Sequence, residues 1–130
     1  MSRIYLDSSP VIYLVQQVVP FGPTVRTRLS ASGVVCVSSD LTRLECLVLP
    51  LRNGDSRMIA DFDTFFSAEV AEMVSFTPAV FRRAAEIRAR FNFRTPDALH
   101  LAAAVEAACD RFLTNDALLT RYPGLTVEVI

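Results

Sequence analysis

The chain has 130 residues, the usual size of one domain, and 52% of them are hydrophobic against 21% charged, which excludes a disordered chain and makes a second folded unit unexpected. The formal net charge of −1 does not indicate a nucleic-acid partner by itself, yet all 13 basic residues are arginines. Arginine binds phosphate through a planar fork of N–H donors, so the basic side chains are compatible with a polyanionic substrate.

The three cysteines form neither a zinc-binding spacing nor a disulfide framework. Cys36, Cys46 and Cys109 are widely spaced and stand in apolar stretches, as is typical of buried, reduced thiols. At the N-terminus Asp7 interrupts the apolar run, so we expect no signal peptide. Glutamines, prolines and a glycine within residues 8–25 argue against a membrane span. These features predict a cytoplasmic protein that does not enter the membrane.

Helix-start signals follow the apolar runs along the chain. Ser9 as N-cap before Pro10 opens the first expected helix, and Thr followed by Pro recurs at 77–78 and 95–96. Pro50 is expected to end the third helix. In chain order, the expected strands span residues 3–7, 34–38, 70–76, 111–114 and 126–130, and the expected helices span 10–19, 24–31, 40–49, 56–67, 78–91, 95–109 and 117–122.

This order of elements indicates an α/β fold. The run Val34–Ser38 is almost entirely apolar and β-branched, as expected of a strand that is buried on both faces of a parallel sheet. Strands that alternate with helices imply a mostly parallel sheet with helices on both faces. In such sheets, ligands bind in the crevice at the carboxyl ends of the strands.

Two carboxylates stand where strands are expected to end. Asp7 closes the first strand, and Asp116 comes shortly after the strand Arg111–Thr114. The alternative role for each is to cap the following helix. Because Ser9 is expected to cap the first helix, Asp7 is free for the crevice, whereas Asp116 is expected to cap its helix as well.

Two further carboxylates stand on expected helices. Glu45 lies beside Leu44 and Leu49 on the apolar side of its helix, where a carboxylate needs a cation or good hydrogen bonds. The alternative is a side chain at the helix edge that reaches solvent. Asp97 lies in a first helical turn, where an acid favours the helix dipole in any case. It also shares a face with Leu101, which should pack on the sheet.

Four carboxylates in one crevice would repel each other unless a cation neutralised them. Hard divalent cations prefer oxygen ligands, and no cluster of histidines or cysteines accompanies these acids. The acids therefore favour Mg²⁺, with Mn²⁺ as a substitute, over zinc.

Four segments resemble those of a known family in order and spacing. They are Ile4–Ser9 (IYLDSS), the apolar helix around Glu45, Arg94–Ala102 (RTPDALHLA) and Phe112–Asp116 (FLTND). Together they resemble the PIN domain over essentially the whole chain, and most of all the VapC-like toxins of bacterial toxin–antitoxin modules.

The resemblance implies a single PIN domain over residues 1–130, with a three-layer fold and a mostly parallel sheet of four to five strands flanked by helices. It implies a Mg²⁺-dependent endoribonuclease that hydrolyses RNA phosphodiester bonds by metal-activated water. It further implies a homodimer and a cognate antitoxin protein. The metal-binding and catalytic acids would be Asp7, Glu45, Asp97 and Asp116, supported by Ser8 and Thr114.

Two other residues lie close to the expected site. The arginine run from Arg82 to Arg94 is slightly better explained as a solvated helix face, but Arg94, next to the site, is the best candidate for a contact with an RNA phosphate. His100, the single histidine, follows Asp97 by one turn. A hydrogen bond from His100 to a neighbour is favoured over a phosphate contact, and no partner nucleophile suggests a catalytic triad.

Two alternative functions remain open. The glycine-rich loops of dinucleotide-binding and P-loop proteins are absent from the sequence. A PIN-like fold could still serve as a non-catalytic RNA-binding or scaffold module, or could cleave DNA. The charge-free stretch 8–25 also holds more apolar side chains than one helix can bury, Val19 and Phe21 among them, so we expect part of it to lie in a protein interface.

Overall fold

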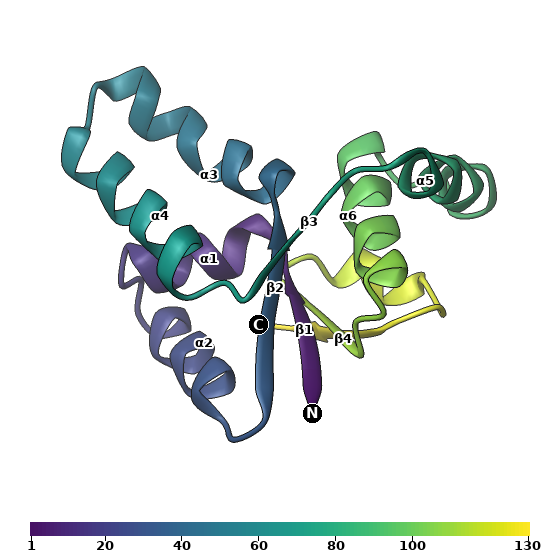
Figure 1. Ribbon diagram of the computed structural model, residues 1–130, viewed down its shortest axis with the longest axis horizontal. Coiled ribbons are helices and arrows are strands. Elements are labelled where there is room, and N and C mark those ends of the chain that lie inside the picture. The colour runs from purple at the N-terminus through teal and green to yellow at the C-terminus, as the bar shows by residue number, and fades with distance from the viewer.

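The computed structural model describes residues 1–130, which form a five-stranded parallel sheet in the order β3-β2-β1-β4-β5 (Figure 1). The strands are β1 (Ser2–Leu6), β2 (Val34–Ser39), β3 (Glu72–Val74), β4 (Arg111–Thr114) and β5 (Thr126–Val129). The helices are α1 (Ser8–Val15), α2 (Phe21–Ser30), α3 (Asp40–Asn53), α4 (Ser56–Ala68), α5 (Pro78–Phe91), α6 (Thr95–Glu106) and the 3₁₀ helix η1 (Ala117–Arg121).

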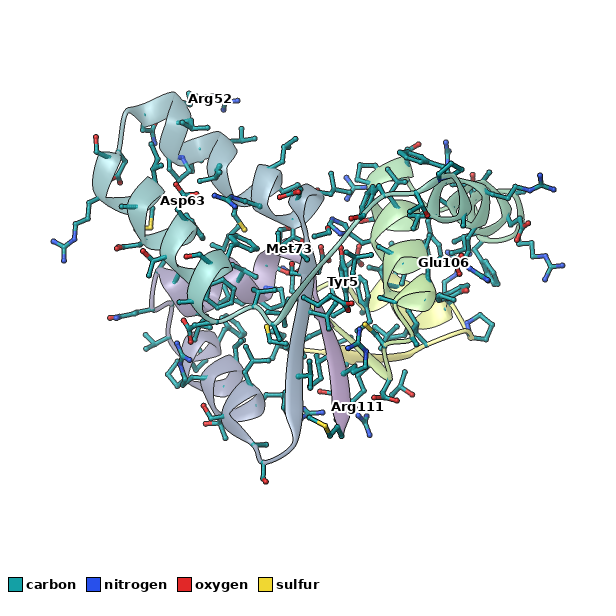
Figure 2. All side chains as sticks on the ribbon, in the orientation of Figure 1. Tyr5, Arg52, Asp63, Met73, Glu106 and Arg111 are labelled. Atoms are coloured by element: carbon teal, nitrogen blue, oxygen red, sulfur yellow. The ribbon has the colours of Figure 1, made fainter.

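The sheet separates two hydrophobic cores, because successive side chains of a strand point to opposite faces. On β1, Tyr5 packs into the core that α5 and α6 cover, whereas Ile4 and Leu6 pack into the core beneath α1, α2 and α4. Figure 1 shows α1 to α4 on one side of the sheet and α5 and α6 on the other, and Figure 2 shows Tyr5 on the sheet between them. The expected three-layer fold is confirmed, and all five strands are parallel.

The first helix differs from its prediction at both ends. It begins at Ser8 rather than Pro10, and its N-cap is Asp7 rather than Ser9. It ends at Val15 rather than Val19, because Gln17 adopts a left-handed conformation with φ of 55°. The N–H of Val18 then donates to the carbonyl of Tyr13 at 2.9 Å. This pattern is a Schellman motif, and a sequence without glycine at that position gave no sign of it.

The expected helix end at Pro50 is also wrong, because α3 continues to Asn53. Proline lacks the N–H that would donate to the carbonyl of Cys46, but the Pro50 side chain is buried and the helix passes through it. The helix ends instead at Gly54, which supplies the left-handed conformation with φ of 62°. The carbonyl of Pro50 accepts the Asp55 N–H at 2.9 Å beyond this turn.

The remaining elements lie close to their predicted ranges. The predictions for α5 and β4 are confirmed, α2 begins at Phe21, and β3 is shorter than expected. All three cysteines are buried and free, as predicted. None of the helices combines the length and the apolar composition that crossing a membrane requires.

Candidate metal centre

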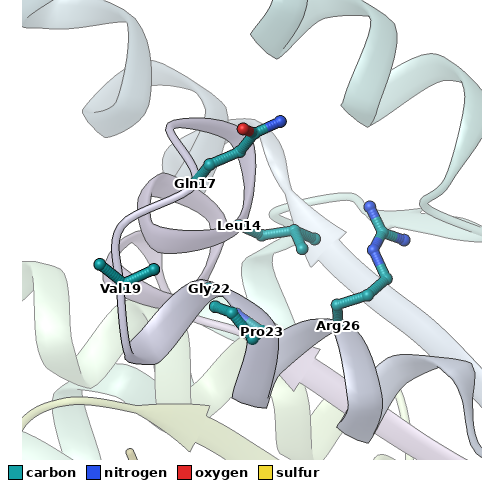
Figure 3. A pocket seen from close by; sticks show the side chains of 6 residues that line it. All are labelled: Leu14, Gln17, Val19, Gly22, Pro23 and Arg26. Carbon is teal, nitrogen blue, oxygen red and sulfur yellow. The ribbon is translucent and has the colours of Figure 1, made fainter.

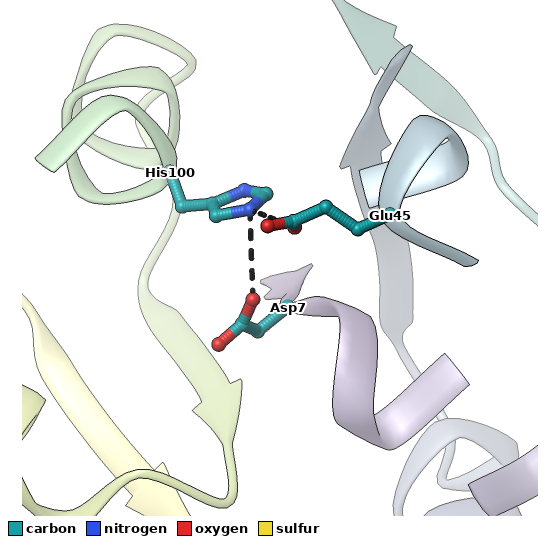
Figure 4. A group of neighbouring side chains, drawn as sticks. All are labelled: Asp7, Glu45 and His100. Carbon is teal, nitrogen blue, oxygen red and sulfur yellow. Dashed lines mark hydrogen bonds and ion pairs between the residues drawn. The ribbon is translucent and has the colours of Figure 1, made fainter. Parts of the chain in front are cut away.

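Asp7, Glu45 and His100 meet beyond the carboxyl end of β1. One ligand atom from each residue lies within 4.8 Å of the others. Figure 4 shows the His100 ring reaching from α6 toward Glu45 on α3, with Asp7 beside both residues at the start of α1. The side chains come from three elements that are far apart in the sequence. The parallel sheet brings them together at the edge where such folds bind ligands.

Asp7 is held by hydrogen bonds to both carboxylate oxygens. Its Oδ1 atom accepts the Ser8 N–H at 2.8 Å, and its Oδ2 atom accepts the Thr114 hydroxyl at 2.8 Å. Thr114 also accepts the Asp116 N–H through Oγ1 at 3.1 Å. Thr114 therefore orients the Asp7 carboxylate directly and links it to the backbone of Asp116. Ser8 contributes its backbone N–H.

Glu45 is held by His100. The Oε1 atom of Glu45 lies 2.6 Å from Nε2 of His100, and this nitrogen lies 3.6 Å from Oδ1 of Asp7. The predicted apolar side of α3 is wrong, because Leu44 and Leu49 are 57% and 56% exposed. Glu45 therefore lies at the boundary between an exposed helix face and the buried imidazole ring.

His100 is the member of the group that the sequence argument left out. The sequence placed His100 near the site but not among the metal-binding residues, whereas in the structure it is 1% exposed and bonded to Glu45. The expectation of a histidine bonded to a neighbour was correct, whereas the partner was unknown. The sequence did contain one signal for this placement. His100 follows Asp97 by three residues, and this spacing puts the two side chains on one face of α6.

Asp97 lies outside the group of three, but its pKa responds to the charge of Asp7. Its side chain is 15% exposed, and its Oδ2 atom accepts the Arg94 Nε–H at 3.2 Å. Burial raises the pKa of Asp97, and the negative charges of Asp7 and Asp116 raise it further, whereas Arg94 lowers it. Asp97 therefore shares the electrostatic environment of the other acids.

Asp116 and Arg94 lie at the edge of the site. Asp116 caps η1 by accepting the Leu118 N–H through Oδ1 at 2.9 Å, as the sequence predicted. Asp116 lies outside the group of three ligand atoms. The side chain of Arg94 is 82% exposed while it pairs with Asp97. It can thus reach solvent beside the acids.

The donor set fits a hard divalent cation. Carboxylate oxygens of Asp7 and Glu45 point to one place, and Asp97 and Asp116 add negative charge beside them. Such cations take oxygen ligands and offset the repulsion between carboxylates. Nε2 of His100 is hydrogen-bonded to Glu45, so the atoms of the group that can bind a cation are mainly carboxylate oxygens.

The raised pKa of Asp97 leads to a pH-dependent prediction for the metal-free protein. The folded protein binds this proton more tightly than the unfolded chain does, so the resulting stabilisation is complete below the ordinary pKa of 3.8 and is lost as the pH rises through the raised value. Asp97→Asn is therefore expected to raise the melting temperature in EDTA at pH 7, with a gain that shrinks as the pH falls toward 4. Thermal unfolding from pH 4 to pH 7 measures this, and Asp61→Asn on the exposed face of α4 is the control. A gain independent of pH would contradict the assignment.

Comparisons with known proteins identify the class. The family model for the PIN domain matches residues 4–125, so the chain belongs to the PIN domain family. Among curated proteins, no match was found.

Solved structures of the same fold include toxin–antitoxin complexes. A chain of VapBC2 from Rickettsia felis, bound to a DNA fragment from its promoter, superposes with a TM-score of 0.81 at 16% identity, covering 98% of both chains. DNA-bound VapBC from Salmonella typhimurium gives 0.76 at 20% identity and covers 99% of this chain and 98% of the other. VapC20 from Mycobacterium tuberculosis, described as a sarcin–ricin loop cleaving toxin, gives 0.68 at 18% identity, with 84% and 86% covered. The expected PIN-like fold is thereby confirmed.

Proposed function

We propose that this chain is a Mg²⁺-dependent endoribonuclease and the toxin of a toxin–antitoxin pair, with Mn²⁺ as a substitute for Mg²⁺. The observation that carries the proposal is the convergence of the Asp7 and Glu45 carboxylates, within 4.8 Å of one another, at the carboxyl end of the central strand. Two carboxylates at this edge, with Asp97 and Asp116 beside them, suit a cation that handles phosphodiesters.

Each residue of the site has a defined task in this proposal. Asp7, Glu45, Asp97 and Asp116 would hold the cation. The bound cation would supply Lewis acidity that activates a water molecule and stabilises the leaving oxygen. Thr114 fixes the direction of Asp7 through its 2.8 Å hydrogen bond.

Arg94 is proposed to bind substrate. Its exposed guanidinium lies next to Asp97 and is suited to an RNA phosphate on either side of the scissile bond. Phosphate contacts of this kind position a nucleic acid without reading its sequence. The arginine therefore contributes to affinity and register rather than to the choice of bases.

A cleavage assay on the wild-type protein separates this function from its two alternatives. We expect labelled single-stranded RNA to be cleaved with Mg²⁺ or Mn²⁺ and to stay intact with EDTA. DNA of the same sequence is expected to stay intact throughout. Cleavage of the DNA would favour a DNA-cleaving relative. RNA that is bound but never cleaved, with either cation, would favour a non-catalytic RNA-binding or scaffold module.

We further propose that the chain acts in the cytoplasm, forms a homodimer and binds a co-encoded antitoxin. Support comes from relatives of the same fold that are named as VapBC complexes. It also comes from apolar side chains that the single chain leaves exposed, such as Val19 at 77%. Figure 3 shows Val19 in the connection between α1 and α2, beside a hollow that Leu14 and Arg26 also line.

An added charge at Val19 tests the homodimer. Because Val19 is largely exposed, Val19→Asp should leave the fold intact and act on an interface alone. We expect the molar mass measured by light scattering to shift from dimer toward monomer. Thr27→Asp, which adds the same charge at an exposed position of α2, is the control. A dimer that persists unchanged in Val19→Asp would remove this segment from the interface.

A further inference from the structure

We propose that His100 is a positioning residue that holds Glu45 in place for the cation, and that buried Tyr5 and Ser39 hold His100 in turn. This inference rests on the proposed function and assigns a role beyond the four acids. The geometry that supports it is a continuous series of hydrogen bonds from Ser39 through Tyr5 and His100 to Glu45.

Glu45 needs a residue that restricts it. Its side chain is 30% exposed, and the adjacent Leu44 of the same helix is largely exposed. The 2.6 Å contact with His100 is the single side-chain hydrogen bond of Glu45. A glutamate has three rotatable side-chain bonds and loses considerable conformational entropy when it is fixed. Without His100, the Glu45 carboxylate would be free to turn to solvent, away from Asp7.

His100 is itself fixed by its surroundings. Its Nδ1 atom lies 2.8 Å from the hydroxyl of Tyr5, and that hydroxyl lies 2.7 Å from Oγ of Ser39. Tyr5 and Ser39 are fully buried, and the Tyr5 ring stacks on Phe112 at 5.3 Å. The imidazole ring therefore has little freedom to rotate.

The donors and acceptors define a direction along this series. An ionised Glu45 carboxylate can only accept, so Nε2 of the neutral imidazole carries the proton and donates to it. Nδ1 of His100 then accepts from the Tyr5 hydroxyl, and the Tyr5 oxygen accepts from the Ser39 hydroxyl. The Ser39 oxygen in turn accepts the Thr42 N–H. A protonated Nε2 has no lone pair for a cation, so His100 acts on Glu45 instead of serving as a metal ligand.

The position of this series explains why it matters to the site. Tyr5 and Ser39 belong to the sheet, Glu45 belongs to α3, and His100 belongs to α6 on the opposite face. The bond between His100 and Glu45 thus joins the two helical layers above the edge of the sheet. It sets the position of the acid on α3 relative to Asp97 on α6.

Mn²⁺ binding in the absence of RNA tests the role of His100. Isothermal titration calorimetry is expected to show that His100→Leu weakens Mn²⁺ binding by about 10- to 100-fold, the usual loss for a residue that supports a ligand. His100→Gln should bind nearly as wild type, because its amide can still donate to Glu45. In the Glu45→Gln background, His100→Leu should cause no further loss, since its effect passes through Glu45.

Several outcomes would overturn the inference. Losses that add in the double variant would make His100 an independent ligand. A lower melting temperature with unchanged Mn²⁺ affinity would make its role purely structural. If His100→Leu does not fold, Tyr5→Phe is the substitute, because it keeps the ring on Phe112 and removes only the hydroxyl. Unchanged Mn²⁺ affinity in that variant would also reject the proposed series.

A metal-free measurement separates this inference from the proposed function. If the wild-type protein binds no Mn²⁺, the proposed metal site fails. Nitrogen-15 spectroscopy of His100 then decides the positioning role by itself. A slowly exchanging proton on Nε2 that disappears in Glu45→Ala supports it, and an unprotonated Nε2 in the wild-type protein rejects it.

Discussion

Asp7→Asn is expected to reduce Mg²⁺-dependent RNA cleavage at least about 100-fold, a loss typical of removing one electrostatic contribution from an active site. Asp7 is the acid with the most constrained carboxylate, because both of its oxygens accept hydrogen bonds and it lies 8% exposed at the end of β1. Asparagine keeps the shape and one acceptor oxygen but removes the charge that the cation needs. The fold should survive, at a cost of about 1 kcal/mol for one weakened hydrogen bond.

The measurement is the initial rate of cleavage of a labelled RNA, with circular dichroism to verify the fold. Asp61→Asn removes an equal charge from the exposed face of α4 and should cleave RNA at the wild-type rate. Asp97→Asn should behave like Asp7→Asn. Full activity in both Asp7→Asn and Asp97→Asn would reject the metal-nuclease proposal.

Mn²⁺ at millimolar concentration is expected to raise the melting temperature of the wild-type protein. Asp7 and Glu45 lie together in the folded state, and burial, together with the charges of Asp7 and Asp116, already disfavours the ionised form of Asp97. A cation that binds only this folded arrangement stabilises it by about 2.7 kcal/mol when its concentration is 100 times the dissociation constant. Mg²⁺ should act in the same direction at higher concentration.

Thermal unfolding with increasing Mn²⁺, at constant ionic strength, measures the effect. The double variant Asp7→Asn with Glu45→Gln should lose the response, because two of the oxygen ligands then lack their charge. Asp61→Asn should respond as the wild type does. A melting temperature indifferent to Mn²⁺ in the wild-type protein would contradict a shared cation site.

The sequence predicted the architecture because its strands and helix starts carry local signals. The apolar β-branched run that became β2 and the Thr-Pro pairs that precede α5 and α6 are decided by neighbouring residues. The end of α1 was wrong because a left-handed Gln17 closes it, although glycine is the usual residue there. The end of α3 was wrong because a buried Pro50 is tolerated within the helix. The first exception is closed by local hydrogen bonds that need no glycine, and only the second involves a buried side chain.

Local sequence signals also pointed to the candidate acids, but they could not predict the hydrogen bonds that hold these acids in place. Strand ends located Asp7 and Asp116, and helical spacing placed Asp97 toward the sheet. The partner of His100 lies 55 residues away on another layer, so no local pattern linked it to Glu45. The cap of α1 was misassigned because Ser9 before Pro10 gave the stronger local signal. In the structure, Asp7 both caps α1 and faces the site.

The hydrogen bond between Asp7 and Thr114 joins residues that are 107 positions apart in the sequence. The strands that carry them are adjacent in the sheet, so β1 has an open edge until β4 pairs with it. Closing such a long loop is a late and entropically costly step of folding. During synthesis, the acidic site therefore cannot assemble until the chain through β4 has left the ribosome. A polypeptide interrupted before β4 would lack both the hydroxyl that orients Asp7 and the last acid.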